Sequence, residues 1–268
     1  MKNSFFKDKV VIITGSSMGI GKELAHQVLK AGGKVVLNAR NAVKLENTRN
    51  AFNMFADNIL VHPSDVRDYT QDVSLIKSTI DRFGRLDILI TNAGVFSSGK
   101  VENTLPEVAR QVIDTNIYGS LFPIMAAIPE LKKSKGSILL VSSLAGLHGM
   151  PGHTPYSISK MSLKALAQSL RIELQHSGIY VGIAYPGFTV NEKEKKTLNA
   201  GGAWEDVPQR PKKLTASREE TAAKILQQIK NKKHSSAHFL FGKITSFLSR
   251  FFPYILFRLL QKNFVPYK

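Results

Sequence analysis

The stretch that decides the fold is Val10-Val11-Ile12-Ile13-Thr14-Gly15-Ser16-Ser17-Met18-Gly19-Ile20-Gly21. Its first four residues form a continuous apolar run, which is typical of a parallel strand buried on both faces. Three glycines precede the helical pattern of residues 22–30, so the backbone can turn tightly and approach a phosphate group at the helix N-terminus. An ordinary strand–helix turn can have this composition, but the strand before it and the helix after it favour a dinucleotide-binding turn.

Apolar runs and helical patterns alternate along the chain at short intervals, without a break in composition. After the first strand, further strands are expected at residues 34–38, 58–62, 86–90, 136–141, 179–184 and 238–242. This alternation predicts an α/β fold, a single Rossmann-type doubly wound parallel sheet of about seven strands with helices on both faces. The long helical region at residues 105–133 is expected to bend or split at Pro123 and Pro129.

The same pattern predicts the division of the chain. Residues 1–242 are expected to form one nucleotide-binding domain, and residues 243–268 an apolar, basic C-terminal extension. Residues 190–216 show no clear periodicity and are rich in Lys, Glu, Gly and Pro. A loop of that length inside a compact domain is usually functional, so we expect a lid over the substrate. Ser217 and Glu220 predict a capping box at the start of the next helix.

The composition limits the classes of protein and partner. The 268 residues include no Cys, which excludes a disulfide framework and a zinc site built on Cys ligands. Residues 1–9 contain no apolar stretch typical of a secretory signal, so we expect a cytoplasmic protein. The net charge of +17 predicts attraction to a nucleic acid, a phosphorylated cofactor or a membrane surface. Because no motif that reads nucleic acid is recognisable, a nucleic-acid partner is not expected.

The end of the second strand bears on the cofactor. In folds of this kind an acidic residue there binds the NAD ribose, whereas a basic residue accommodates the 2′-phosphate of NADP. Here the strand ends in Ala39-Arg40-Asn41, and Lys44 follows one helical turn later. Because no carboxylate stands at this end, Arg40 and Lys44 predict NADP(H). The alternative is that both are solvated surface charges.

A second functional candidate is the pair Tyr156 and Lys160, which follows Ser142 and Ser143 at the end of the strand expected at residues 136–141. The pair is four residues apart in an expected helix, so the two side chains share one face. An ammonium group near a phenol favours the phenolate and lowers the pKa of the tyrosine toward the range of acid–base catalysis. By itself, however, this spacing is common on the surface of amphipathic helices.

Together these features resemble the short-chain dehydrogenase/reductase family over almost the whole chain to Gly242. The resemblance rests on Thr14-Gly15-x-x-x-Gly19-Ile20-Gly21, Asp65-Val66, Asn92-Ala93-Gly94, Asn116, Ser143, Tyr156-x-x-x-Lys160 and Pro186-Gly187. Each motif is modest alone, but the ordered set is specific. Thr91 stands where the family usually has an asparagine, which is a mild departure.

The resemblance implies an oxidoreductase with a catalytic tetrad of Asn116, Ser143, Tyr156 and Lys160. Tyr156 would exchange a proton with the substrate oxygen, and Ser143 would hydrogen-bond the carbonyl. Lys160 would lower the pKa of Tyr156 and hold the nicotinamide ribose. Asn116 would position a water that links Lys160 to solvent. The spacing to Tyr156 favours Ser143 over Ser142 for the catalytic serine, and a contribution from both stays open.

The resemblance also implies which residues surround the cofactor. They come from the glycine-rich turn, from the ends of the third and fourth strands, and from the segment after the sixth. Besides Arg40, Lys44, Tyr156 and Lys160, the implied residues are Gly15, Ser17, Met18, Ile20, Asp65, Val66, Asn92, Ala93, Gly94, Pro186, Gly187 and Thr189. Thr189 is displaced from the usual P-G-x-x-x-T spacing of the family.

Within the family, Asn116-x-x-Gly119-Ser120, Val141-Ser142-Ser143 and Ala184-Tyr185-Pro186 are similar to segments of 3-oxosphinganine (3-ketodihydrosphingosine) reductases. This resemblance implies NADPH-dependent reduction of a ketone on a lipophilic substrate, and a homo-oligomer, either dimer or tetramer. Steroid and 3-oxoacyl reductases of the same family share much of the pattern. A different class, a non-catalytic NADP-binding sensor or scaffold, would be favoured by a broken tetrad, but all four positions are filled.

The C-terminal extension combines apolar and cationic residues. No acidic residue follows Glu220, and residues 244–260 are dense in aromatic and aliphatic side chains. Arg250, Pro253 and Arg258 interrupt this segment, so a membrane-spanning helix is not expected. Two interpretations remain open: peripheral contact with the cytoplasmic face of a membrane through cationic residues, or a helix that packs on the domain or on a partner subunit.

Overall fold

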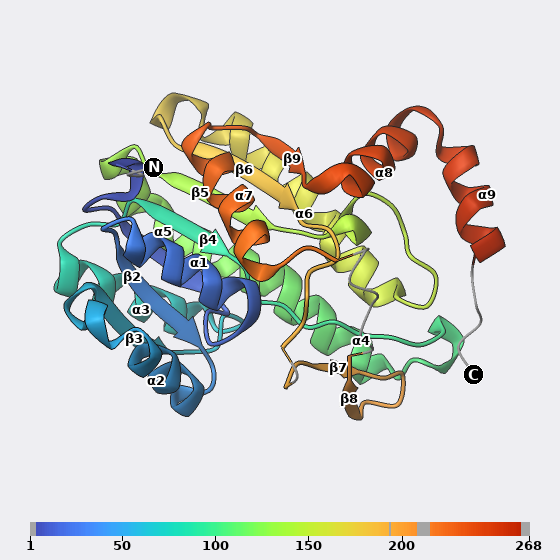
Figure 1. The fold of residues 1–268 in the computed structure, drawn as a ribbon, viewed down its shortest axis with the longest axis horizontal. Coiled ribbons are helices and arrows are strands. Elements are labelled where there is room, and N and C mark those ends of the chain that lie inside the picture. Colours follow the sequence, from blue (N-terminus) through green and yellow to red (C-terminus); the bar gives the residue numbers. More distant parts are fainter. Residues whose placement is uncertain (1–3, 193, 208–214, 264–268) are drawn as a thin grey trace.

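The computed structural model describes residues 4–192, 194–207 and 215–263. Its centre is a seven-stranded sheet of order β3-β2-β1-β4-β5-β6-β9, in which every neighbouring pair is parallel (Figure 1). The strands are β1 (Val10–Thr14), β2 (Lys34–Ala39), β3 (Ile59–Pro63), β4 (Ile88–Thr91), β5 (Ser137–Val141), β6 (Tyr180–Tyr185) and β9 (Ser235–Ala237). The predicted doubly wound parallel sheet is therefore confirmed.

Helices cover both faces of the sheet. Successive strand residues point to opposite faces, so Ile13 packs with the helices of one face and Ile12 with those of the other. The first face carries α1 (Gly19–Lys30), α2 (Ala42–Ala51) and α7 (Arg218–Lys230), and the second carries α3 (Tyr69–Phe83), α5 (Gly119–Ser134) and α6 (Thr154–Glu173). Because apolar side chains are buried on both sides, the strands are continuous apolar runs.

The strand order reverses between β1 and β4. The strands β2 and β3 lie on one side of β1, whereas β5, β6 and β9 lie beyond β4. In open α/β sheets, ligands bind at such a reversal, outside the carboxyl ends of the strands. Thr14 ends β1 and Thr91 ends β4 at this point. The fold therefore places the glycine-rich turn beside the segment that follows β4.

The expected break in the helical region at residues 105–133 is present, but not at the prolines. The region divides into α4 (Pro106–Ile113), a π-helical turn (Asp114–Tyr118) and α5, and both Pro123 and Pro129 lie inside α5. The π-helical turn carries Asn116. Such wide turns often occur at functional sites, because they redirect side chains within a continuous helix.

The last strand lies earlier than the sequence predicts. The strand β9 pairs with β6 through Ser235, Ser236 and Ala237, whereas the apolar residues expected to form it begin the helix α8 (Phe239–Phe251). Phe239 has a φ of 62°, so the chain changes direction at this residue. Small residues at the edge of the sheet therefore form the strand, and the boundary expected at residue 242 falls inside α8.

Residues 190–216 are more ordered than an irregular loop. They include an antiparallel hairpin of β7 (Lys196–Leu198) and β8 (Trp204–Asp206), while residues 193 and 208–214 lie outside the described part. The predicted capping box at Ser217 and Glu220 is present at the start of α7.

The C-terminal extension forms two helices, α8 and α9 (Pro253–Asn263), which meet at Phe252. They project from the side of the molecule toward which the strands of the sheet point (Figure 1). The predicted break at Pro253 is therefore confirmed. Among the helices of the described residues, none combines the length and the hydropathy needed to cross a bilayer.

Candidate functional site

The glycine-rich turn between β1 and α1 packs directly on the segment that follows β4. A Cβ atom on Gly15, whose φ is 65°, would lie 2.8 Å from the Cα of Ala93. A Cβ atom on Gly21 would lie 2.3 Å from the carbonyl oxygen of Gly15. Carbon atoms do not approach heavy atoms this closely, so the turn requires glycine at both positions.

Asn92 holds this turn in place. Its Nδ2 atom donates hydrogen bonds to the carbonyl oxygens of Thr14 and Gly15, at 3.0 and 3.1 Å. In return, the Thr14 hydroxyl accepts from the backbone N–H groups of Asn92 and Ala93, at 3.0 and 3.1 Å. The ends of β1 and β4 are thereby joined into one rigid platform.

The outer side of the turn is open at Gly19, where the pyrophosphate of a dinucleotide is predicted to bind. Gly19 has a φ of 60°, and no atom lies within 4 Å of the place where its Cβ would be. It also begins α1, whose N-terminal N–H groups and positive dipole end stabilise an anion. Ser17, Met18 and Ile20 of the same turn are partly exposed. Their individual contacts with a cofactor stay predictions.

The end of β2 suits an additional phosphate group. Arg40 and Lys44 are both exposed, and within the described residues neither forms an ion pair with a carboxylate. Asn41 caps α2 by accepting a hydrogen bond from the backbone N–H of Lys44 at 2.9 Å. Burial pushes the pKa of Asp65 upward, but its hydrogen bonds with Arg67, and the charges of Arg67 and Arg40, hold that pKa below its ordinary value. Arg40 and Asp65 therefore lie close enough to interact.

Two implied cofactor residues have structural roles as well. Val66 is buried against α5, where a Cβ on Gly119 would lie 2.6 Å from its Cγ2. Gly94 faces two of the predicted catalytic residues, since a Cβ there would lie 3.0 Å from Asn116 Oδ1 and 3.4 Å from Lys160 Nζ. A side chain at residue 94 would therefore crowd the site.

Both polar atoms of the Asn116 side chain are hydrogen-bonded within the protein. Its Oδ1 atom accepts from the Val95 N–H at 2.7 Å, and its Nδ2 atom donates to the Val95 carbonyl at 3.0 Å and to Ser159 Oγ at 2.8 Å. Asn116 therefore ties the segment after β4 to the helix α6. The π-helical turn brings this amide into the position where it reaches both partners.

Lys160 is buried in α6 and points toward the end of β5. Its Nζ atom donates to the Val141 carbonyl at 3.0 Å and lies 5.9 Å from the centre of the Tyr156 ring. Burial, together with the charge of Lys195, lowers the pKa of Lys160 to about 8. The predicted proximity of Tyr156 and Lys160 is thus present.

The predicted effect on the pKa of Tyr156 is not found. Burial raises this pKa, and a hydrogen bond with the Ser143 side chain opposes the rise only in part. Lys160 is not among the groups that lower the pKa of Tyr156 in this structure. Its ammonium group donates a hydrogen bond to the Val141 carbonyl. The Tyr156 hydroxyl is therefore held in its protonated form.

The two serines after β5 have different roles. Ser142 is buried, and its hydroxyl donates to the Lys160 carbonyl at 2.8 Å, which anchors α6 to the sheet. Ser143 instead interacts with the Tyr156 hydroxyl, and its Oγ atom also accepts from the Ala145 N–H at 3.3 Å. The structure thus brings Ser143, and not Ser142, to the tyrosine, as the spacing predicts.

The segment after β6 lies at the same edge of the sheet. Pro186 is buried, and the Thr189 hydroxyl interacts with that of Thr221 on α7 at 3.0 Å and with the Gly187 carbonyl at 3.3 Å. Thr189 is therefore turned toward α7, in keeping with its displaced position in the motif.

Sequence reasoning missed Phe96, which packs on Tyr156, and His153, which packs on Phe96. The Phe96 ring packs edge-on against the Tyr156 ring, with centroids 4.9 Å apart, and against His153 at 4.8 Å. The His153 ring is anchored by its Nδ1 atom, 2.9 Å from the Ser97 carbonyl. The only sequence signal for Phe96 is its position two residues after Gly94.

Sequence reasoning also missed the carboxylate of Glu192 at the start of α1. The Gly19 N–H donates to Glu192 Oε1 at 2.9 Å, and Arg218 Nη1 lies 2.5 Å from the same oxygen. Glu192 is separated from Gly19 by most of the chain, so no local pattern signals this contact.

Comparisons with known proteins agree with this geometry. Residues 9–200 match the family model described as short chain dehydrogenase. The chain is 40% identical over 205 residues to a 3-dehydrosphinganine reductase of Arabidopsis thaliana, covering 72% of this chain and 61% of the relative. It is 37% identical over 197 residues to a 3-dehydrosphinganine reductase of Danio rerio, covering 69% and 59%. The chain therefore spans about three-fifths of the length of these relatives.

A solved short-chain dehydrogenase from Streptomyces avermitilis has the same fold. It matches with a TM-score of 0.80 at 22% identity, over 95% of this chain and 96% of that one. Because the family model covers well over half of the residues, the protein belongs to the short-chain dehydrogenase family of oxidoreductases.

Proposed function

We propose that this protein uses NADPH to reduce the ketone of a lipophilic substrate to a secondary alcohol, with 3-oxosphinganine as the first candidate. The observation that carries the proposal is the meeting of Ser143, Tyr156 and Lys160 at the carboxyl edge of the sheet, beside the glycine-rich turn. The 3-dehydrosphinganine reductases among its relatives support the choice of substrate.

The protonation state of Tyr156 supports the proposed direction of the reaction, which is reduction of the ketone. Reduction of a ketone adds a hydride to the carbon and a proton to the oxygen, and a bound nicotinamide supplies the hydride. Since burial raises the pKa of Tyr156, its hydroxyl keeps the proton that the carbonyl oxygen must receive. Ser143 would donate a hydrogen bond to the same oxygen. The ammonium group of Lys160 would stabilise the phenolate that remains.

The choice of NADPH over NADH rests on charge. Arg40 and Lys44 are exposed at the end of β2 without a carboxylate partner in the described residues, and no acidic residue stands in Ala39-Arg40-Asn41 to bind a ribose. The 2′-phosphate of NADPH would form ion pairs with both cations.

The lipophilic character of the substrate rests on the surroundings of Tyr156. Its ring packs on a cluster of Val95, Val108, Val112 and Leu198, and Leu198 comes from the hairpin strand β7. Apolar packing beside the proton donor favours a substrate whose ketone lies next to hydrocarbon.

Turnover of purified protein with NADPH tests the proposal. The panel should contain 3-oxosphinganine, a 3-oxoacyl thioester and a ketosteroid, and nicotinamide absorbance should fall with at least one of them. Tyr156→Phe should lower kcat by about 10²- to 10⁴-fold while NADPH binding persists. Unchanged turnover in this variant would show that the acid is wrongly assigned. NADPH binding without turnover of any ketone would favour a sensor or scaffold instead.

A further inference from the structure

The helices α8 and α9 present an apolar stripe to solvent. Leu240, Ile244, Phe247 and Phe251 recur at the i, i+4, i+7, i+11 spacing of one helix face and are 73%, 48%, 55% and 57% exposed. In a globular protein this spacing normally marks the face that packs on the core. Here the core side of α8 is formed by Gly242 and Thr245, so the large side chains are left outside.

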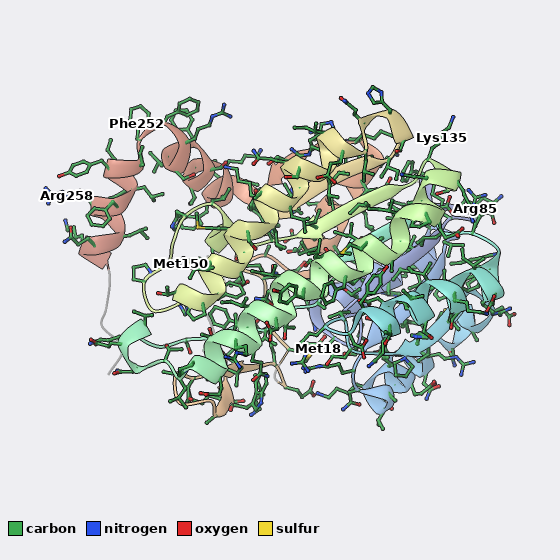
Figure 2. The ribbon with its side chains drawn as sticks, turned by 180° about the vertical axis from the view of Figure 1, so that it is seen from behind. Met18, Arg85, Lys135, Met150, Phe252 and Arg258 are labelled. Atoms are coloured by element: carbon green, nitrogen blue, oxygen red, sulfur yellow. The ribbon has the colours of Figure 1, made fainter. Side chains whose placement is uncertain are left out.

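The stripe continues into α9. Four further side chains of α9, and Phe252 at the junction, are about half exposed or more: Phe252, Tyr254, Ile255, Phe257 and Leu259. In the described part of α9, Leu256 is the large side chain that is buried. Figure 2 shows Phe252 and Arg258 at the outer end of the two helices, away from the body of the protein. An exposed apolar surface that is contiguous over two helices marks an interaction site.

The charged side chains of α8 and α9 are all positive. Lys243, Arg250, Arg258 and Lys262 are exposed, and no acidic residue occurs after Glu220. Within the described residues, Arg250 and Arg258 lie over the rings of Phe251 and Tyr254, at 5.3 and 5.2 Å, and not beside carboxylates. Aromatic side chains with cations and no anions match the interface of an anionic bilayer.

A second copy of this chain suits the surface less well. Two copies that met through α8 and α9 would bring both sets of four cations together without a carboxylate to neutralise them. Nucleic acid would leave the aliphatic side chains Leu240 and Ile244 in water. An anionic lipid surface covers the apolar side chains and neutralises the cations at the same time.

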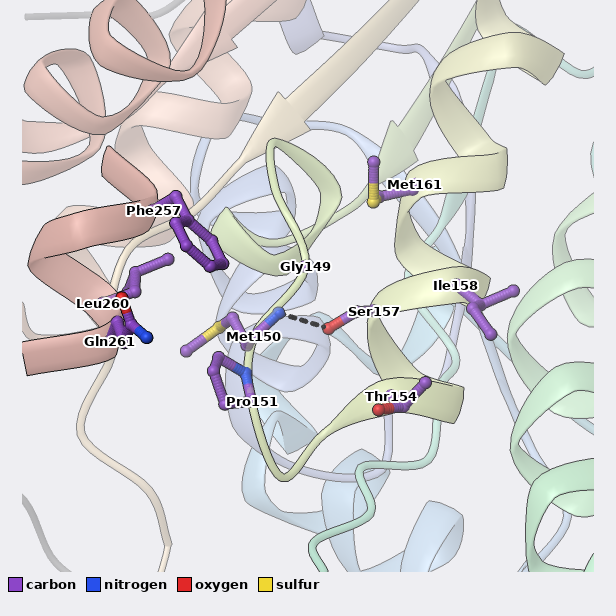
Figure 3. A pocket seen from close by; sticks show the side chains of 10 residues that line it. All are labelled: Gly149, Met150, Pro151, Thr154, Ser157, Ile158, Met161, Phe257, Leu260 and Gln261. Atoms are coloured by element: carbon purple, nitrogen blue, oxygen red, sulfur yellow. Dashed lines mark hydrogen bonds between the residues drawn. The ribbon is translucent and has the colours of Figure 1, made fainter. Parts of the chain in front are cut away.

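A groove connects this surface with the catalytic helix. Phe257 and Leu260 on α9 face Met150 and Pro151, and Ile158 and Met161 on α6, across an apolar groove of about 440 Å³ (Figure 3). The next residue of α6 after Thr154 and Pro155 is Tyr156. A hydrocarbon chain that leaves the bilayer at α9 would therefore reach the helix that carries the proton donor.

We propose that the exposed faces of α8 and α9 form a docking surface for anionic lipid bilayers. The apolar stripe inserts among the acyl chains, and the four cations contact the lipid phosphates. The groove beside α9 receives a hydrocarbon chain of a lipid from that bilayer, and this last part rests on the proposed function. Docking of α8 and α9 on the bilayer does not rest on the proposed function, because vesicle binding is measured without turnover.

Flotation of the full chain with vesicles tests the docking surface. Vesicles of phosphatidylcholine alone are compared with vesicles that also contain phosphatidylserine, at low and high salt. The protein should float with the anionic vesicles, and salt should weaken this binding because it screens the cations. Arg250→Gln with Arg258→Gln should lower the partition coefficient on anionic vesicles by about tenfold or more. Ile244→Ser with Phe247→Ser should lower it to a similar extent.

Two matched pairs serve as controls. Lys30→Gln with Lys132→Gln removes two exposed cations elsewhere, and Val43→Ser with Met54→Ser removes two exposed apolar side chains on the body of the domain. Both control pairs should float like the unchanged protein, and NADPH binding should show that all variants are folded. The proposal is overturned if the full chain stays unbound to anionic vesicles, or if control and test pairs lose binding equally. It is also overturned if the Ile244→Ser and Phe247→Ser pair dissociates an oligomer without changing flotation.

Discussion

The carboxylate of Glu192 accepts a hydrogen bond from the backbone N–H of Gly19, 2.9 Å away, at the N-terminus of α1. The same oxygen lies 2.5 Å from Arg218 at the start of α7. Glu192 thereby joins the segment after β6 to two helices of one face of the sheet. It also places a negative charge where the pyrophosphate of the proposed cofactor would bind.

Removal of this charge should strengthen cofactor binding. We expect Glu192→Gln to lower the Kd for NADPH roughly two- to fivefold, because a carboxylate at a helix N-terminus contributes about 0.3–1 kcal/mol that the cofactor must displace. Fluorescence titration measures the change. Glu194→Gln alters an exposed glutamate of the same segment and should leave the Kd unchanged. Equal effects of both substitutions would mean that the general charge of the segment, and not the contact with Gly19, controls binding.

The cations at the end of β2 should select the 2′-phosphate. Arg40→Ser is expected to raise the Kd for NADPH about tenfold and to leave the Kd for NADH nearly unchanged, since only NADPH carries the phosphate that Arg40 would contact. Arg49→Ser removes a cation at the far end of α2, where Arg49 pairs with Glu46, and should affect neither cofactor. A parallel loss of NADPH and NADH affinity in Arg40→Ser would contradict the assignment.

Cofactor binding should also weaken as Lys160 loses its proton. Burial lowers the pKa of Lys160 to about 8, so the ammonium form is present below this pH and disappears above it. We expect the Kd for NADPH to rise between about pH 7 and about pH 9, because an anionic ligand loses a nearby cation. Calorimetric titration over this range measures the change. In Lys160→Met the Kd should be higher at neutral pH and should vary less over the same range.

Asp72 should make the fold less stable at higher pH. It is fully buried on α3 without a hydrogen-bond partner for either oxygen, and burial, followed by the charges of Asp68 and Asp65, raises its pKa to about 8. Between the unfolded value near 4 and this value, the native state holds a proton that the unfolded chain releases. The free energy of unfolding should therefore fall as pH rises through this interval, by at most about 1.4 kcal/mol per pH unit, and level off above about pH 8.

Asp72→Asn removes the titration but keeps the shape of the side chain. The variant should be more stable than the unchanged protein at pH 8, and the difference should shrink as the pH falls toward about 5. Urea denaturation at several pH values measures both curves. A pH-independent difference between the two proteins would show that Asp72 is ionised in the native state.

Local patterns were sufficient for most of the fold. Apolar runs such as Val10–Thr14 and the glycines after it are read within a few residues, since a strand buried on both faces and a tight turn each depend on neighbouring side chains. The same holds for the capping box of Ser217 and Glu220. The pairing of Tyr156 with Lys160 was predictable because one helical turn separates them.

Local patterns failed where a distant contact decides the outcome. The helical region that contains Pro123 widens into a π-helical turn at Asn116. There the side-chain amide of Asn116 is hydrogen-bonded to Val95 and Ser159. The edge strand forms at Ser235–Ala237 because these residues pair with the backbone of β6, although the neighbouring residues are more apolar.

The sequence by itself determined the parallel α/β sheet, the glycine-rich turn and the proximity of Tyr156 and Lys160, because each depends on residues that are close along the chain. Only the tertiary structure decided that burial raises the pKa of Tyr156, that Glu192 lies on the N-terminus of α1, and that the apolar face of α8 is exposed. These three properties depend on burial and on partners far away in the chain, and no local pattern of residues contains that information.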